Sequence, residues 1–401
     1  MNKITKRLSI DHALIHISYQ AMAGIIYGFT VYLLLARGFD SATTGLVLAF
    51  ANIFSLIIQP FVSNFLDKTK KLTVFEVMII TSVLMLTLFF ISSIINNSKI
   101  VLLVTFTLSI GIYSSLEPLF NSLASVFKFN GYDIEFGKAR AFGSLSYALV
   151  CTLFGALTNN GSYVVVLIGG CAFALLITLV CIIIRKDFRK AVDKPIIEEE
   201  DDTIGFVEFI SSNPIYMLLC ILLVGVFFGY LGADNFTYLV VENVGGSSSD
   251  MGIILGIKAA LESIIIFNYS KIRKYFKLKT LINVCMLGFV LKSLTYFLAT
   301  STLTIYLAQI LQMMSFALII PTMIEYIETN MKKEVSNRAQ AFFTMTIGLG
   351  SVISSAIGGV IIDNFGVSRV LFVYLMVTII SAICFAIVFK IDMDMRNGQK
   401  N

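Results

Sequence analysis

The sequence predicts an all-α integral membrane protein, with twelve transmembrane helices in two six-helix pseudo-repeat bundles and both termini in the cytoplasm. Composition is the first observation: 57% of the residues are hydrophobic, 14% are charged, and the mean hydropathy is +0.87. A soluble chain of 401 residues has no interior for that much apolar surface. The second observation is a series of apolar runs of span length, and the third is a weak similarity between the two halves.

The spans follow from hydropathy, since each run is close to the roughly 20 residues that a helix needs to cross a bilayer. They cover residues 11–35, 43–66, 73–95, 99–125, 137–157, 162–184, 214–240, 250–268, 279–299, 303–326, 337–361 and 368–390. The predicted domains are an N-terminal six-helix bundle at 1–184, a cytoplasmic linker at 185–213 and a C-terminal six-helix bundle at 214–401. The linker is too charged to pack and is expected to act as a tether, while residues 204–210 are expected to form a short interfacial helix.

Orientation follows from the positions of Lys and Arg. With a cytoplasmic N-terminus, the outer loops keep only Arg37, Lys99 and Arg369, and the other loop cations fall inside. The pI near 8.7 then reflects topology rather than nucleic-acid binding. The first apolar run is of full span length and lacks a small-residue cleavage site, so we expect no cleavable signal peptide and a multi-pass protein of the cell membrane.

No cofactor or metal is expected. The six cysteines lie singly in apolar spans, which is typical of inert small hydrophobes. His12 and His16 are four residues apart on the first helix, but a zinc site needs four ligands and no third one is recognisable. We therefore favour an interfacial polar face for these two histidines.

The two halves resemble one another in short stretches. Residues 44–48 and 55–58 recur as 251–255 and 263–266, and residues 138–142 recur as 338–342. Repeats of this kind are typical of secondary transporters. The second copy has Gln340 where the first has Arg140, so this arginine is not required to build the fold and is better explained by function.

Arg140 stands about one turn inside an apolar helix that carries no further charge up to Leu157. A guanidinium at that depth costs about 2.5 to 3.5 kcal/mol on insertion scales, so it marks a functional site by default. Ser144 and Tyr147 lie on the same helical face. The alternative is an arginine that snorkels back to the headgroups while Ser144 packs against another helix.

The other spans also hold charges of both signs, which suggests pairing. Lys258 and Glu262 are four residues apart on one face, and Asp234 and Lys292 lie at similar depths. The alternative is that such pairs are fixed and only hold helices in register. The full set is Glu117, Asp234, Lys258, Glu262, Lys292 and Glu325.

The run Glu135-Phe136-Gly137-Lys138-Ala139-Arg140-Ala141-Phe142-Gly143 resembles the opening of the fifth helix of the oligosaccharide:proton symporters of the major facilitator superfamily, the branch of lactose permease. The resemblance implies the major facilitator fold, with Arg140 binding sugar together with Tyr147. Residues 63–71 resemble the signature between helices 2 and 3, which implies that Asp67 and Lys68 take part in gating on the cytoplasmic side. The alternative there is an ordinary solvated turn, because exposed ion pairs are worth little.

The same resemblance places Lys292 at a basic position of the proton site, Lys258 at a sugar-binding acid and Asp234 near the helix 7 aspartates. It fails on helix 10, where the family's Lys, His and Glu are replaced by Gln309, Gln312 and Ser315, and on helix 4, where the family acid is missing. The expected solute-binding set is Arg140, Ser144, Tyr147, Asn121, Lys258 and Gln312. The expected coupling set is Asp234, Lys292, Glu262, Glu117 and Glu325, with Asp234 favoured as proton carrier.

These residues predict a secondary active transporter, not an enzyme, that takes up a small polar solute such as a sugar, glycoside or nucleoside with protons, and that works as a monomer in the bilayer. The first alternative is proton-driven multidrug efflux, although the fifth helix lacks the glycine-proline motif of such exporters. The remote alternative is a non-transporting membrane sensor.

Overall fold

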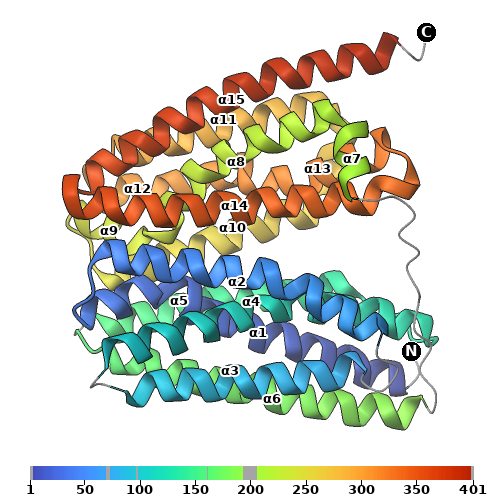
Figure 1. The fold of residues 1–401 in the computed structure, drawn as a ribbon, viewed down its shortest axis with the longest axis vertical. Coiled ribbons are helices and arrows are strands. Elements are labelled where there is room, and N and C mark those ends of the chain that lie inside the picture. The colour runs from blue at the N-terminus through green and yellow to red at the C-terminus, as the bar shows by residue number, and fades with distance from the viewer. Residues whose placement is uncertain (1–2, 69–72, 96–97, 160, 193–205, 399–401) are drawn as a thin grey trace. The chain divides into compact units, whose positions relative to one another are not determined.

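The structure is a computed structural model that describes residues 3–68, 73–95, 98–159, 161–192 and 206–398. The side chains of 60–68, 206–207, 333–334 and 397–398 fall outside that description, so the predicted gating residues Asp67 and Lys68 can be placed only as the end of a helix. Every regular element within the described ranges is a helix (Figure 1).

The helices follow the predicted spans closely. In the first half they are α1 (Lys3–Ala36), α2 (Ser41–Lys68), α3 (Val74–Ile94), α4 (Lys99–Phe129), α5 (Phe136–Thr158) and α6 (Val164–Ala191). A short helix, α7 (Phe206–Ser212), overlaps the predicted interfacial segment. In the second half they are α8 (Pro214–Asn235), α9 (Thr237–Asn243), α10 (Ser248–Tyr275), α11 (Leu278–Phe297), α12 (Thr302–Ala308), the 3₁₀ segment η1 (Gln309–Met314), α13 (Phe316–Asn330), α14 (Lys333–Phe365) and α15 (Val367–Gly398).

Two predicted spans differ from a single continuous helix. The span at 214–240 is divided at Phe236 into α8 and α9, and the span at 303–326 is interrupted by η1. Among the described residues, 11 helices are long and apolar enough to cross a membrane. The eighth predicted span, at 250–268, lies in α10, which has 28 residues but is more polar than the other eleven. The predicted all-helical membrane fold is confirmed.

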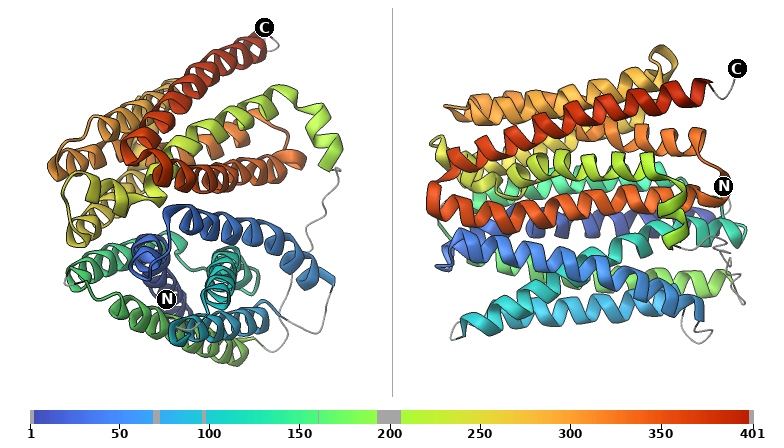
Figure 2. Two further views of the ribbon diagram at one scale, coloured as in Figure 1. Left: turned by 60° about the vertical axis from the view of Figure 1, so that its left-hand side comes forward. Right: turned by 45° about the horizontal axis from the view of Figure 1, so that its top comes forward.

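The chain divides into two compact units. The first contains Met1–Phe39, Leu46–Glu200 and Met251–Ala259, and the second contains Asp40–Gly45, Asp201–Asp250 and Ala260–Asn401. The helices of the first unit, coloured blue to green, run roughly along one direction in the right-hand view of Figure 2.

Each unit uses the same packing scheme. In the first unit α1 packs against α5 and α6, and α3 packs against α4 and α6. In the second unit α8 packs against α14 and α15, and α11 packs against α13 and α15. Matching the six spans in order makes these partners equivalent, so the weak sequence repeat corresponds to a repeat of helix packing.

Glycines allow the closest of these approaches. On α8, a Cβ atom at Gly229 would lie 2.5 Å from the backbone oxygen of Tyr374 on α15. Small residues at helix contacts are typical of membrane proteins, because packing and interhelical hydrogen bonds replace the hydrophobic effect there. A backbone atom cannot rotate away, so α8 and α15 would have to separate to admit any side chain at residue 229.

We therefore expect Gly229→Ala to lower the thermal unfolding midpoint of the purified protein by several degrees, because overpacking typically costs about 1 to 3 kcal/mol. The matched control is Gly137→Ala, at a helical glycine whose added Cβ meets no atom within 4 Å. Equal midpoints for the two variants would contradict this account of the α8–α15 contact.

Candidate functional site

Arg140 forms an ion pair inside the first unit. Its Nη1 lies 3.1 Å from Oε1 of Glu117, and the side chains are 37% and 39% exposed. Arg140 comes from the second turn of α5, and Glu117 comes from the middle of α4. The sequence analysis named both residues as charges within the predicted spans, and the structure brings the two together. The guanidinium is thus held by a carboxylate at a site that is still accessible.

Pro118 follows Glu117 directly inside α4. A proline has no N–H, so the carbonyl of Ser114 loses its usual helical donor. The side-chain amide of Gln59, on α2, donates to that carbonyl at 3.4 Å, and the Ser114 hydroxyl lies 2.9 Å from the hydroxyl of Tyr27. The irregular turn beside Glu117 is therefore stabilised by polar groups from α1 and α2.

Aromatic and unpaired polar groups lie near the ion pair. Tyr19 on α1 stacks on Tyr113 on α4 with ring centroids 4.5 Å apart, and both rings are within electrostatic reach of Glu117. The Tyr19 hydroxyl and the Asn121 side-chain oxygen are buried and have no hydrogen-bond partner among the described residues. Asn121 lies one turn beyond Glu117 on α4, so a hydrogen-bonding solute near Glu117 would find an acceptor there.

Ser144 and Tyr147 are partly buried on α5, one and two turns beyond Arg140. The Ser144 hydroxyl makes a long bond of 3.4 Å to the carbonyl of Arg140. Gly143 keeps this part of α5 close to α1, because a Cβ there would lie 3.0 Å from the backbone oxygen of His16. The predicted column of three residues thus lies on a helix that is closely packed against α1.

His12 and His16 do not lie on an interfacial polar face, and that expectation is wrong. Both are buried, with ring centroids 4.7 Å apart, and Phe136 packs against both rings. Within the described ranges no group of three or more His, Cys, Asp or Glu side chains could hold a metal ion. The spacing of two histidines in a sequence is the same whether their helix face contacts lipid headgroups or another helix. The sequence could therefore not show whether His12 and His16 are buried.

The second unit holds a buried cation. Lys292 on α11 is only 3% exposed, and its ammonium donates to the side-chain oxygens of Gln312 at 2.5 Å and Gln309 at 3.4 Å. The ammonium also lies 4.9 Å from the ring centroid of Tyr230 and 5.6 Å from that of Tyr296. A buried charge needs such partners, because an unpaired one would cost several kcal/mol.

The side-chain amides of the two glutamines also donate hydrogen bonds to other groups. Gln312 donates to the Tyr230 hydroxyl at 2.7 Å and to Glu262 on α10, and Gln309 donates to the Tyr296 hydroxyl at 2.9 Å. Lys292 is thereby connected to Glu262 through one amide. Asp234 on α8 and Lys292 line the same small hollow of about 10 Å³, which has room for about one water.

The 3₁₀ geometry of η1 explains how both glutamines reach one lysine. A 3₁₀ helix has three residues per turn, so Gln309 and Gln312 lie one turn apart on one face of η1. Both are fully buried, as is Ser315 directly after η1. On α11, a Cβ at Gly288 would lie 2.5 Å from the backbone oxygen of Met314, so only glycine lets α11 come this close. Gln309, Gln312 and Ser315 are the positions at which the oligosaccharide:proton symporters that the sequence resembles carry Lys, His and Glu.

Glu325 and Lys258 complete the predicted set. Glu325 on α13 is held by Arg273 at 2.7 Å and by the Tyr269 hydroxyl at 2.7 Å, both from the end of α10. Lys258 lies one turn before Glu262 on α10. Glu325 therefore has the contacts of a fixed ion pair that connects α10 and α13.

Comparison with known proteins agrees with this geometry. The family model described as "MFS_1 like family" matches residues 13–374. The chain belongs to that family. It is accordingly a transporter of the major facilitator type, a multi-pass membrane protein and not an enzyme, as the sequence predicted.

Two curated relatives cover nearly the whole transporter. A maltose permease of Geobacillus stearothermophilus is 22% identical over 367 residues, which are 90% of this chain and 89% of the permease. An uncharacterized transporter of Bacillus subtilis (strain 168), YwbF, is 24% identical over 377 residues, which are 91% of this chain and 88% of that one.

Solved structures show the same fold. A point mutant of the nucleoside transporter NupG matches with a TM-score of 0.81 at 13% identity, covering 95% of this chain and all of that one. An auto-inhibited peptide transporter of the POT family matches with a TM-score of 0.72 at 12% identity, covering 97% of each chain. At these identities the likeness concerns the fold alone.

Several residues of the two clusters escaped the sequence reasoning, namely Tyr19, Tyr113, Tyr230, Tyr296 and Gln309 as a ligand of Lys292. One signal was present for the glutamines. A buried lysine must find acceptors, and the next span carries two amides three residues apart at matching depth. The tyrosines gave no comparable signal, because aromatic residues are common on apolar faces.

We expect Lys292→Met to destabilise the transporter strongly, by about 3 to 5 kcal/mol, since it removes one member of a buried charged network and leaves the side-chain oxygens of both glutamines without this donor. The measurement is the thermal unfolding midpoint in detergent. Lys279→Met is the control, since this lysine is on the same helix but is 41% exposed and lies 3.9 Å from Asp394. A smaller effect at 292 than at 279 would contradict the proposed importance of the network.

Proposed function

We propose that this transporter takes up a small polar solute, a sugar, glycoside or nucleoside, together with protons by alternating access. The observation that carries the proposal is the accessible Arg140–Glu117 pair with stacked tyrosines beside it. The names of two similar proteins, a maltose permease and a nucleoside transporter, support the same solute class.

The pair has the chemistry that a hydroxyl-rich solute requires. The guanidinium offers several N–H donors in a fixed fork, and the carboxylate offers acceptors, so two neighbouring hydroxyls can bind to both at once. An aromatic ring such as that of Tyr147 packs on the apolar face of a sugar or base. We include Ser144 and Asn121 as further lining residues, and we keep Lys258 as a proposed solute contact from α10.

Gln312 is better assigned to coupling than to solute binding. It is fully buried, and its amide is engaged by Lys292, Tyr230 and Glu262. The Gln312 side chain therefore interacts with the charged groups of the network and not with solvent or a dissolved solute. We therefore change its proposed role from the one expected from sequence.

Proton coupling is proposed to use the carboxylates around Lys292. A carrier must alternate between a neutral and a charged form, and it must be released from or captured by a cation in that cycle. Asp234 lines the same hollow as Lys292. We propose that the ammonium of Lys292 holds this carboxylate when it has lost its proton and releases it when the proton returns.

Binding is tested with Arg140→Lys. We expect a loss of solute affinity of about tenfold to a hundredfold, because an ammonium cannot replace the planar fork and a hydrogen bond to a charged group is worth about 1.5 to 3 kcal/mol. The measurement is equilibrium binding of labelled maltose and labelled uridine to purified protein.

The control for that test is Lys138→Gln, two residues away, where the lysine is 70% exposed and paired with Glu135. Parental binding by Arg140→Lys would show that the guanidinium does not hold the solute. If the parent binds neither probe but extrudes a lipophilic dye, uptake of a polar solute is the wrong function.

Coupling is tested with Asp234→Asn, which mimics the protonated form. We expect exchange of labelled solute across proteoliposome membranes to persist while accumulation driven by a pH gradient is lost. Full accumulation by this variant would transfer the role to Glu262. A parent that does not respond to the pH gradient at all would exclude proton coupling.

A further inference from the structure

The last two turns of α6 carry a compact basic face. Arg185, Lys186, Arg189 and Lys190 are spaced so that all four lie on one side of the helix. Together with Ile182 they line a hollow of about 330 Å³. The distribution of Lys and Arg along the chain assigns this end of α6 to the cytoplasmic side.

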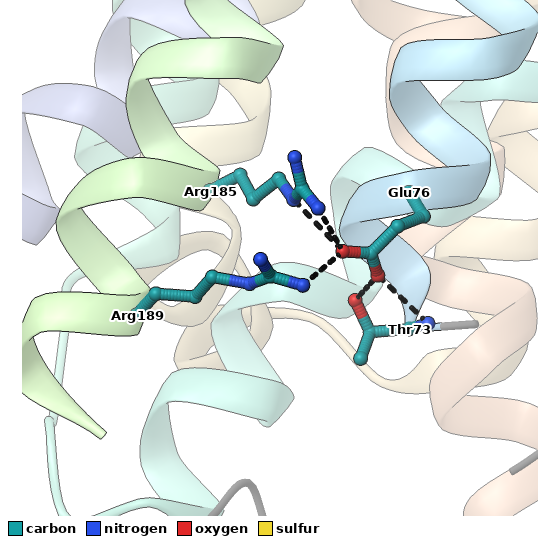
Figure 3. Close-up of polar contacts among 4 residues, drawn as sticks. All are labelled: Thr73, Glu76, Arg185 and Arg189. Carbon is teal, nitrogen blue, oxygen red and sulfur yellow. Dashed lines mark hydrogen bonds and ion pairs between the residues drawn. The ribbon is translucent and has the colours of Figure 1, made fainter. Parts of the chain in front are cut away.

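One carboxylate fixes both arginines (Figure 3). Oε1 of Glu76 accepts hydrogen bonds from Nε of Arg185 at 2.8 Å and from Nη2 of Arg189 at 2.6 Å. Its other oxygen accepts from the backbone N–H of Thr73 at 2.9 Å and from the Thr73 hydroxyl, at the start of α3. Glu76 is therefore held by the helix start, and the two guanidinium groups are oriented before any ligand arrives.

The face keeps an excess of positive charge. Asp187 is the second carboxylate nearby, but it is bound to Arg7 at 2.7 Å and is 4.0 Å from Lys190. Lys186 is exposed and makes no ion pair with any residue that the structure describes. Among the residues that the structure describes, these four cations therefore face two carboxylates, Glu76 and Asp187, so an anion binding there meets a net positive field.

Apolar side chains continue directly from this basic face. Leu179, Ile182 and Ile183 are 47%, 46% and 37% exposed on the preceding turns of α6. In a membrane protein such residues face acyl chains, and the change from apolar to basic side chains marks the level of the headgroups. A ligand that matches both parts has an anionic phosphate next to long hydrocarbon chains.

We propose that this hollow on α6 is a binding site for the phosphate headgroup of an anionic phospholipid, whose chains lie along Leu179, Ile182 and Ile183. The arginines that Glu76 orients supply directional donors, and Lys186 and Lys190 supply charge. A pre-oriented arginine loses little entropy on binding a phosphate, which favours a defined site over diffuse attraction. The proposal does not depend on which solute is transported.

The test uses the purified full-length protein in a neutral detergent, with phosphatidylglycerol, phosphatidylcholine and inorganic phosphate as probes. Native mass spectrometry counts bound lipid, and the thermal unfolding midpoint reports stabilisation. We expect tight binding of phosphatidylglycerol only. The double variant Lys186→Gln, Lys190→Gln should weaken it at least tenfold, because each basic residue near a lipid surface contributes roughly one kcal/mol.

The matched control is Lys271→Gln, Lys274→Gln, which removes two exposed lysines from the C-terminal end of α10. The distribution of Lys and Arg assigns this end to the cytoplasmic side as well. An effect below twofold supports a defined site on α6, whereas equal losses in both double variants would reduce the proposal to general charge attraction. Equal affinity for phosphatidylcholine would overturn it, and so would inorganic phosphate binding as well as the lipid.

Glu76→Gln separates orientation from charge. This variant increases the net positive charge of the face, so simple attraction predicts tighter lipid binding. Loss of the orienting carboxylate predicts weaker binding, and we expect a decrease of several fold. Tighter lipid binding by Glu76→Gln would contradict the orienting role of Glu76.

The folding of the double variant Lys186→Gln, Lys190→Gln is checked separately. An unfolding midpoint without lipid equal to that of the parent confirms that the weaker lipid binding of this variant is not a folding defect.

Discussion

The second unit is organised by the need to stabilise one ammonium group in an apolar bundle. Lys292 is only 3% exposed, so most of the polar groups that it requires come from the surrounding helices. Two neutral amides and two aromatic rings meet that need, and a carboxylate is connected through one of the amides.

The two units carry their charges differently on the same scaffold of helices. Equivalent helices pack in equivalent ways in each unit. In the first unit, however, the side chains of the Arg140–Glu117 ion pair are more than a third exposed, whereas Lys292 in the second unit is almost fully buried. An exposed pair can exchange one partner for a ligand at low cost. A buried network can change only if a proton or a whole helix moves. This contrast is what recommends Arg140 and Glu117 for recognition and the Lys292 network for coupling.

Much of the fold could be predicted from the sequence, because span length and hydropathy are direct consequences of the bilayer. The Arg140–Glu117 pair was also within reach, since a cation and an anion at membrane depth must find partners. The interruption at 309–314 was not, because a hydropathy window averages over a local change of helical winding. The burial of His12 and His16 could not be predicted either, as lipid and protein interiors are both apolar surroundings for a helix face.

The 3₁₀ segment η1 supplies both glutamine partners of Lys292, and its winding also sets the length of the element formed by α12, η1 and α13. Its six residues rise about 2.0 Å each instead of 1.5 Å and turn about 120° each instead of 100°. Rewinding them into an α-helix would shorten the element by about 3 Å and rotate α13 by about a third of a turn. Glu325, in the second half of α13, would then swing away from Arg273. A change in hydrogen bonding at the middle of the membrane would in this way be converted into a screw motion that reaches its surface.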